Sequence, residues 1–158
     1  MWQKIKPYAV SIAIALAVGG LSAWLTSGNM ELYASLRQPP LAPPGIVFPI
    51  VWTILFILMG FGAADVYVRR EQQKIAADNA LAVYAVNLVV NFLWSILFFH
   101  YRAFGFAFFW LLFLAAIVVR MIFSFYRVSP RAAYLQIPYL IWLSFAGYLN
   151  CAIWLLNR

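Results

Sequence analysis

Three stretches of the chain carry aromatic rings and neutral amides at helical spacing. Tyr84, Asn87, Asn91, Trp94 and Phe98 are three or four residues apart, so on a helix they share one face. Two asparagines exposed to lipid would lack hydrogen-bond partners, so this face must point into the protein. A second stretch repeats the theme and a third adds apolar rings, and their residues are Tyr139, Trp142, Ala146, Asn150, Trp52, Phe56 and Met59.

These residues favour noncovalent binding of a flat ligand. At 1.5 Å per residue, Trp52, Trp94 and Asn150 each lie about 9–10 Å from the same end of their helices, and Asn91 and Trp142 lie somewhat deeper. A cavity with aromatic walls, neutral amides and no charge suits a flat, largely apolar ligand with a few polar edges. The alternative is an ordinary aromatic core with interhelical asparagine hydrogen bonds.

The residues needed for other chemistries are scarce. The single histidine, His100, and the single cysteine, Cys151, exclude a disulfide framework and a Cys/His metal cluster. No nucleophile–base pair is apparent for hydrolysis. The basic residues sit in short connections, so nucleic acid is a poor match. We expect no required cofactor and no metal.

Two ionisable residues fall inside apolar stretches. Asp65 and Arg120 are both close to the same side of the membrane. Charges within a membrane usually pair or line a hydrated path. Because there is no chain of carboxylates, a structural Asp65–Arg120 ion pair is favoured over a proton or ion path, with snorkelling of Arg120 as a further alternative.

The composition identifies the elements that must position these residues. Of 158 residues, 66% are hydrophobic and only 9% are charged, whereas a soluble domain carries roughly 25% charged residues. The sequence predicts an all-α membrane protein, one domain over residues 1–158, with five transmembrane helices in one bundle. The expected spans are Pro7–Leu25, Ile46–Val68, Ala80–Phe99, Phe104–Tyr126 and Ala132–Leu156.

The first connection, Thr26–Gly45, is the longest, and a loop of this length is often a lid. Within it, Met30–Leu36 could form a short helix on the membrane surface. In the fifth span, Pro138 removes one backbone hydrogen bond and should kink the helix. Small residues at Ser11, Ala15, Gly19 and Ala23 form a ridge, for which packing within the chain is favoured over a dimer interface.

Orientation follows from the lysines and arginines, which collect on the cytoplasmic side. The N-terminal side carries Lys4, Lys6, Arg69, Arg70, Lys74, Arg127 and Arg131, and the other side carries Arg37, Arg102 and Arg158. We therefore expect a cytoplasmic N-terminus, an external C-terminus and an external first loop. The net charge of +7 suits contact with anionic membrane lipid.

Several motifs resemble one known family. ELYASLRQPPLAPPGIVFPIVWTILFILMGFGA is similar to the first loop and second helix of the tryptophan-rich sensory protein/translocator protein (TspO/MBR) family. NLVVNFLWSILFF resembles its third helix, and VSPRAAYLQIPYLIWLSFAGYLNCAIW resembles its fifth. The resemblance implies an often dimeric five-helix bundle with a pocket closed by the first loop. The implied pocket residues are Tyr33, Trp52, Phe56, Asn87, Asn91, Trp94, Trp142, Ala146, Leu149 and Asn150.

The resemblance also implies ligands: porphyrin or haem, other tetrapyrroles, hydrophobic aromatic molecules and sterols. Where the sterol motif of animal members has Tyr, this chain has Cys151, which puts sterol binding in doubt. The favoured function is a receptor or binder of porphyrins, acting in their sensing, transport or turnover in a bacterial cell membrane. The alternatives are an enzyme of light-dependent porphyrin degradation, with Trp142 and Trp52 as candidates for the photochemistry, and a transporter of small hydrophobic molecules.

Overall fold

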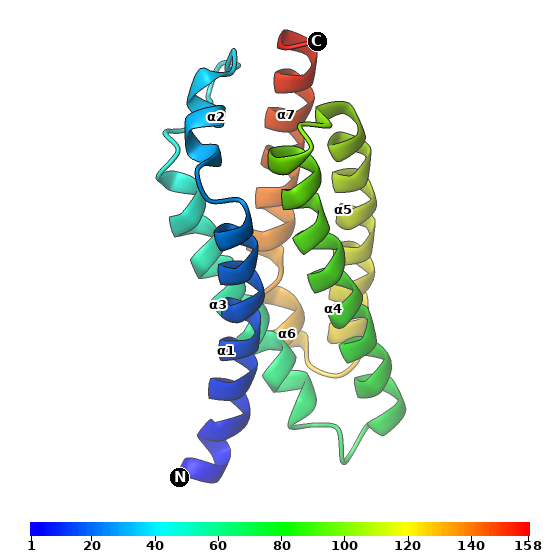
Figure 1. Ribbon diagram of the computed structural model, residues 1–158. Helices are drawn as coiled ribbons and strands as arrows, with labels where there is room; N and C mark the ends of the chain where they lie inside the picture. The colour runs from blue at the N-terminus through cyan, green and yellow to red at the C-terminus, as the bar shows by residue number, and fades with distance from the viewer.

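The computed structural model describes residues 1–158 and is entirely helical. Five helical segments are long and apolar enough to span a membrane, which confirms an all-α multi-pass membrane protein. The two termini lie at opposite ends of the molecule (Figure 1). The elements are α1 Trp2–Leu25, α2 Asn29–Ser35, α3 Val47–Tyr67, α4 Lys74–Ser95, η1 Ile96–His100, α5 Phe104–Tyr126, α6 Pro130–Tyr134 and α7 Ile137–Leu156.

Helix packing links α1 to α3, α4 to α5, and α5 to both α6 and α7. The α1–α3 pair is close because a glycine faces the partner backbone: a Cβ at Gly60 would lie 2.6 Å from the Cα of Ile12. Ser11 Oγ also donates a 2.7 Å hydrogen bond to Gly60 O. At Gly19 the small ridge meets the ring of Phe56. These positions of the ridge therefore serve packing within the chain, as in membrane helices generally.

The fourth element is longer than its apolar stretch. Helix α4 begins at Lys74, six residues before the predicted start at Ala80, so its first turns are polar. At its other end it continues as a π-helical segment, η1 Ile96–His100. There Tyr101 N donates to Ile96 O over 3.1 Å, five residues back instead of four. Such a widened turn accommodates one extra residue and is common at functional sites.

The fifth span is interrupted instead of kinked. Ser129 caps α6 by accepting a 3.3 Å hydrogen bond from Ala132 N, and Pro130 occupies the first turn. The helix ends at Tyr134, and α7 restarts at Ile137 with Pro138 in its first turn, where no intrahelical N–H bond is lost. At the break, Gln136 is fully buried and donates to Leu58 O and Ala132 O over 3.3 and 3.2 Å.

The connection between α1 and α3 contains α2, Asn29–Ser35, one residue earlier at each end than predicted. Gly28 precedes it with φ +87°, a left-handed conformation that glycine adopts at little cost. Helix α2 lies at the same end of the bundle as the C-terminus (Figure 1).

Asp65 does not pair with Arg120. Its carboxylate is fully buried and forms ion pairs with Arg69, at 2.9 Å, and with Arg131. It also accepts hydrogen bonds from Tyr8 Oη at 2.9 Å and Ser129 Oγ at 2.5 Å. Arg120 lies on an exposed face of α5 and has no acidic partner. Asp65 therefore ties α1, α3 and the start of α6 together.

Candidate functional site

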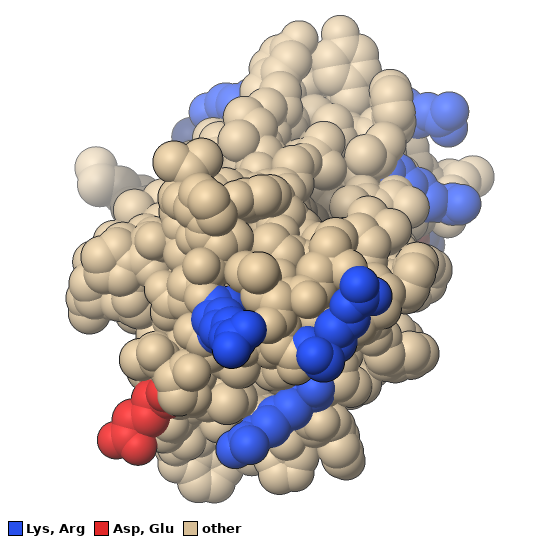
Figure 2. Space-filling view, turned by 90° about the horizontal axis from the view of Figure 1, so that it is seen from above, with Lys and Arg blue, Asp and Glu red and all other residues tan.

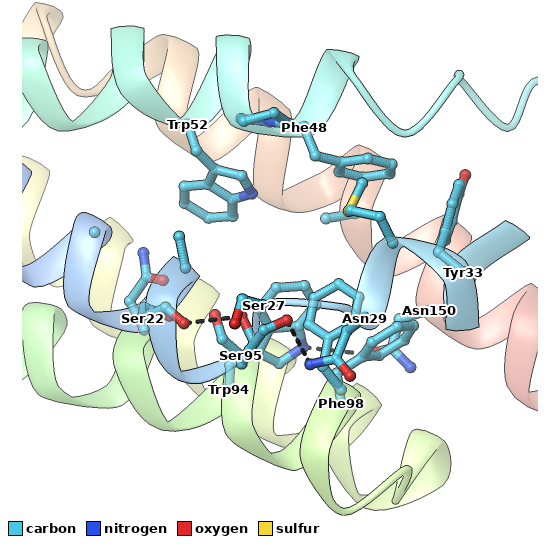
Figure 3. Close-up of a pocket in the computed structure, with 18 of the residues that line it drawn as sticks. Ser22, Ser27, Asn29, Tyr33, Phe48, Trp52, Trp94, Ser95, Phe98 and Asn150 are labelled. Atoms are coloured by element: carbon cyan, nitrogen blue, oxygen red, sulfur yellow. Dashed lines mark hydrogen bonds between the residues drawn. The ribbon is translucent and has the colours of Figure 1, made fainter.

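A cavity of about 250 Å³ lies at the C-terminal end of the bundle, enclosed by α1, α2, α3, α7 and the end of α4 with η1. Figure 3 shows rings from α3 and α4 facing each other across it. Its lining contains no charged residue. The residues are Gly19, Ser22, Ala23, Thr26, Ser27, Gly28, Asn29, Met30, Tyr33, Phe48, Pro49, Trp52, Phe56, Asn91, Trp94, Ser95, Phe98, Phe99, Ala146, Leu149, Asn150 and Ile153.

Two indoles dominate the walls. The ring centroids of Trp52 on α3 and Trp94 on α4 are 6.4 Å apart. Phe56 extends the first wall at 5.8 Å from Trp52, and Phe98 extends the second at 5.5 Å from Trp94. Rings at these separations pack favourably and present flat faces to a guest.

The side-chain amide of Asn150 fixes the orientation of the Trp94 ring, which forms one wall of the cavity. Trp94 Nε1 donates to Asn150 Oδ1 over 3.2 Å, and Asn150 Nδ2 donates to Phe104 O over 2.8 Å. Both side chains are buried, so both polar groups need these partners. The bridge joins α4, α7 and the start of α5 beside the cavity.

A polar chain lies under the floor. Asn91 Nδ2 donates to Tyr139 Oη over 2.7 Å, and Tyr139 Oη donates to Asn87 Oδ1 over 2.8 Å. Asn87 Nδ2 in turn contacts Met59 Sδ at 3.7 Å. Only Asn91 of this chain lines the cavity. Its Oδ1 accepts no hydrogen bond within the protein, which leaves one amide acceptor for a ligand.

The first connection covers the cavity, is braced internally by a hydrogen bond, and is held at two places, by α7 and by its C-cap residue Asn157. Tyr33 Oη donates to Pro43 O over 3.1 Å, and Tyr148 Oη on α7 donates to Pro40 O over 2.7 Å. Arg37 N donates to Asn157 Oδ1 over 2.9 Å, while Asn157 Nδ2 donates back to Arg37 O over 3.0 Å. Burial raises the pKa of Tyr33 above its usual value, so its phenol remains a hydrogen-bond donor into the alkaline range.

The π-helical turn shapes the rim. Phe98 and Phe99 are adjacent in sequence, yet both line the cavity, together with Ser95. In a regular α-helix adjacent side chains point about 100° apart. The widened turn η1 therefore lets two successive rings contribute to one wall.

Most of the predicted pocket residues meet at this cavity: Tyr33, Trp52, Phe56, Asn91, Trp94, Ala146, Leu149 and Asn150. Asn87 and Trp142 do not reach it. Asn87 lies one turn deeper on α4, in the polar chain under the floor. Trp142 packs behind the wall, 5.8 Å from the ring of Phe48 and 5.5 Å from that of Phe145.

Sequence reasoning missed the contribution of α1 and its C-terminal turn. Ser22, Thr26, Ser27 and Asn29 form a polar strip along one side of the cavity (Figure 3). Thr26 Oγ1 donates to Ser22 O over 2.8 Å, and Asn29 Nδ2 donates to Thr26 O over 2.6 Å. The small-residue ridge, which continues to Ala23, was the available signal that this end of α1 leaves space.

The fold and site define a multi-pass membrane protein with an internal, neutral, aromatic cavity beneath its first connection. Residues 11–155 match the model of the TspO/MBR family, and the chain belongs to that family. It is 36% identical to the translocator protein of Bos taurus, over 95% of this chain and 90% of the relative. It is 35% identical to the tryptophan-rich protein TspO of Chlorobaculum tepidum, over 99% of each, and 35% identical to protein CrtK of Rhodobacter capsulatus, over 95% and 90%.

Proposed function

We propose that this protein binds a porphyrin or a related tetrapyrrole in the cavity beneath its first connection. The observation that carries the proposal is the pair of opposed indoles, Trp52 and Trp94, in a cavity without charged residues. A planar conjugated ring gains both apolar burial and ring stacking against the aromatic faces that line such a cavity. The free Asn91 Oδ1 and the polar strip on α1 offer acceptors and donors to its polar edge.

Size constrains how a tetrapyrrole would enter. Cavities for drug-sized ligands measure roughly 300–1,000 Å³, and this cavity holds about 250 Å³. A whole macrocycle therefore requires the covering connection to move outward. The connection is held to α7 and its C-cap by one hydrogen bond from Tyr148 and two between Asn157 and the Arg37 backbone, all at exposed positions, so opening is inexpensive.

The distribution of charge favours one orientation of the ligand, with its polar edge at the mouth of the cavity. The cavity is neutral, so carboxylates on a porphyrin would remain at the mouth, in contact with water. The end of the molecule around the mouth carries Arg37, Arg102 and Arg158 against one acidic residue, Glu31, and Figure 2 shows separated basic side chains and an acidic one on a mostly uncharged surface. Such cations favour the approach of an anionic ligand edge.

Orientation in the membrane is part of the proposal. The excess of lysine and arginine at the N-terminal end of the bundle favours a cytoplasmic N-terminus and an external cavity mouth in a bacterial cell membrane. A reporter that is active only in the cytoplasm should be silent at the C-terminus and active at the N-terminus. The reverse pattern would invert the assignment.

A second candidate function is light-dependent degradation of the bound porphyrin. It is favoured by one observation: two readily oxidised indoles, Trp52 and Trp94, face the same cavity. Under illumination, an absorbing product that forms with the parent and not with Trp94→Phe would support it. Equal binding of porphyrin by the two proteins would show that the loss is chemical.

The test of binding is a fluorescence titration with protoporphyrin IX. We expect micromolar affinity, about −8 kcal/mol, with quenching of tryptophan emission. Trp94→Leu should weaken binding by about 2- to 12-fold, because an aromatic face contributes about 0.5–1.5 kcal/mol beyond its area. The control is Trp24→Leu on α1, whose side chain is 71% exposed and lies off the cavity. Equal affinities for all three proteins would reject this site.

A further inference from the structure

A second cavity lies at the opposite end of the bundle from the first. It measures about 590 Å³ and lies between α1, α3 and α4. Lys6 and Ile14 mark its extent on α1, Ala63 and Ala64 contribute from α3, and Tyr84 contributes from α4. No residue lines both cavities.

Close packing of α1 on α3 separates the two spaces. Ser11 and Ile12 touch the backbone at Gly60, one turn above Ala63 and Ala64. Above that contact, Gly19 packs on Phe56, which belongs to the first cavity. The second cavity is therefore a separate groove.

The groove has the dimensions of part of a hydrocarbon chain. The eight helical steps from Lys6 to Ile14 correspond to about 12 Å along α1. Ala63 and Ala64 are buried small residues that leave this space open, and the exposed Val10, Ile14 and Tyr67 flank it. Ser11 Oγ is already bonded to Gly60 O, so the buried hydroxyl of Tyr84, which has no partner in the protein, is the one hydroxyl in the interior left to a polar guest.

The groove is charged only at one end. Lys6 is exposed, forms no ion pair, and lies near the start of α1, while Ile14 lies two turns deeper toward the middle of the span. Of the three acidic residues at this end, Asp65 is held by Arg69 and Arg131, Asp78 is held by Arg70, and Glu71 is unpaired and does not line the groove. The end also carries Lys4, Arg69, Arg70, Lys74, Arg127 and Arg131, so a free anion meets an excess of positive charge.

We propose that this groove is a binding site for an anionic phospholipid. One acyl chain occupies the apolar groove, and the phosphate lies against the ammonium group of Lys6. A lipid has the same polarity along the membrane normal, with an anionic head at the surface and an apolar tail within. That match in charge and depth selects a phospholipid over a soluble anion, which would gain nothing from the apolar part.

The test is native mass spectrometry of the full chain in detergent with added phosphatidylglycerol or phosphatidylcholine of identical acyl chains. We expect phosphatidylglycerol to bind about fivefold more tightly, since one lysine near an anionic headgroup contributes about that factor. Lys6→Gln should lower phosphatidylglycerol affinity to the phosphatidylcholine level. Lys4→Gln, which removes a neighbouring charge outside the groove, is the matched control and should retain the preference.

Two further variants test the apolar part. Ala63→Leu fills the groove and should weaken the binding of both lipids. A melting curve confirms that the variant is folded. If that variant does not fold, Val10→Trp at the half-exposed lip blocks the same space. Glycerol 3-phosphate should not compete at equimolar concentration. Equal affinity for the two lipids, an unchanged preference in Lys6→Gln, or a dimer that excludes lipid from the groove would overturn the proposal. Protoporphyrin binding should be the same in all these variants.

Discussion

Trp94 and Asn150, 56 residues apart in the chain, are joined by a hydrogen bond of 3.2 Å between the indole N–H and the amide Oδ1. The bond sets the plane of one cavity wall from a neighbouring helix. Asn150 also donates to Phe104 O, so one side chain satisfies buried groups on two other elements. Wall geometry and bundle stability therefore depend on the same amide.

Asn150→Leu should both destabilise the protein and weaken protoporphyrin binding. It leaves the buried Trp94 N–H without its partner, at a cost of about 1–3 kcal/mol, and removes the bond to Phe104 O. Thermal denaturation and fluorescence titration measure the two effects. In a cycle with Trp94→Phe, the double variant should lose less than the sum of the two singles. Strict additivity would mean that the bond contributes nothing.

Gly19→Ala should reduce ligand affinity by narrowing the cavity. A Cβ at Gly19 would lie 2.5 Å from the ring of Phe56, which must shift, and Phe56 lines the cavity. The neighbouring Gly20→Ala is a matched control because a Cβ there meets nothing within 4 Å. Isothermal titration with protoporphyrin IX should show a lower affinity for Gly19→Ala and an unchanged affinity for Gly20→Ala. Similar losses in both variants would point to a helix-wide effect of alanine.

Asp65→Ala should lower stability without changing affinity. Removing the buried carboxylate leaves Tyr8, Ser129 and two arginines without their acceptor. Breaking a buried pair costs about 3–5 kcal/mol, and the lower end applies because both arginines are partly exposed. Arg120→Ala, on the exposed face of α5, should stay within about 0.5 kcal/mol. A drop in porphyrin affinity with an unchanged melting temperature would indicate that the ligand binds at the Asp65 end of the bundle, opposite the proposed cavity.

Asn157→Ala should loosen the covering connection. The variant removes both hydrogen bonds to the Arg37 backbone, so trypsin should cleave after Arg37 several-fold faster. Ser144→Ala is the control on α7, since its hydroxyl bonds only to Leu140 O of the same helix. Gel analysis of the digest gives the rates. Cleavage rates equal to the parent would show that Asn157 does not restrain this segment.

The sequence predicted a helix end well where a change in polarity coincides with that end, and poorly elsewhere. Helices α3 and α5 begin and end within one residue of the prediction, because apolar stretches meet prolines, glycines or arginines there. The start of α4 was missed because the polar turn at Lys74 continues the helix beyond the apolar stretch. The break before Ile137 was missed because a proline can either bend a helix or begin a new one.

The site residues, too, were only partly predictable from the sequence. Helical spacing placed Trp52, Trp94 and Asn150 at one level and Asn91 somewhat deeper, and all four line the cavity. The same spacing predicted that Trp142 also lines the cavity, yet its ring packs against Phe48 and Phe145. The orientation of this side chain depends on packing between helices, which helical spacing alone does not determine. The predicted partner of Asp65 was wrong because Arg131 reaches it from the first turn of α6, outside the apolar spans considered.

The extra residue in η1 also bears on how this rim can vary between sequences. Deleting one residue from Ile96–His100 would restore α-helical bonding and rotate the following side chains by about 100°. The irregular segment Tyr101–Ala103 comes directly afterwards, so it can absorb the change in length before α5 begins. The loss of a single codon here would thus change which aromatic side chains reach the rim while the bundle keeps its register.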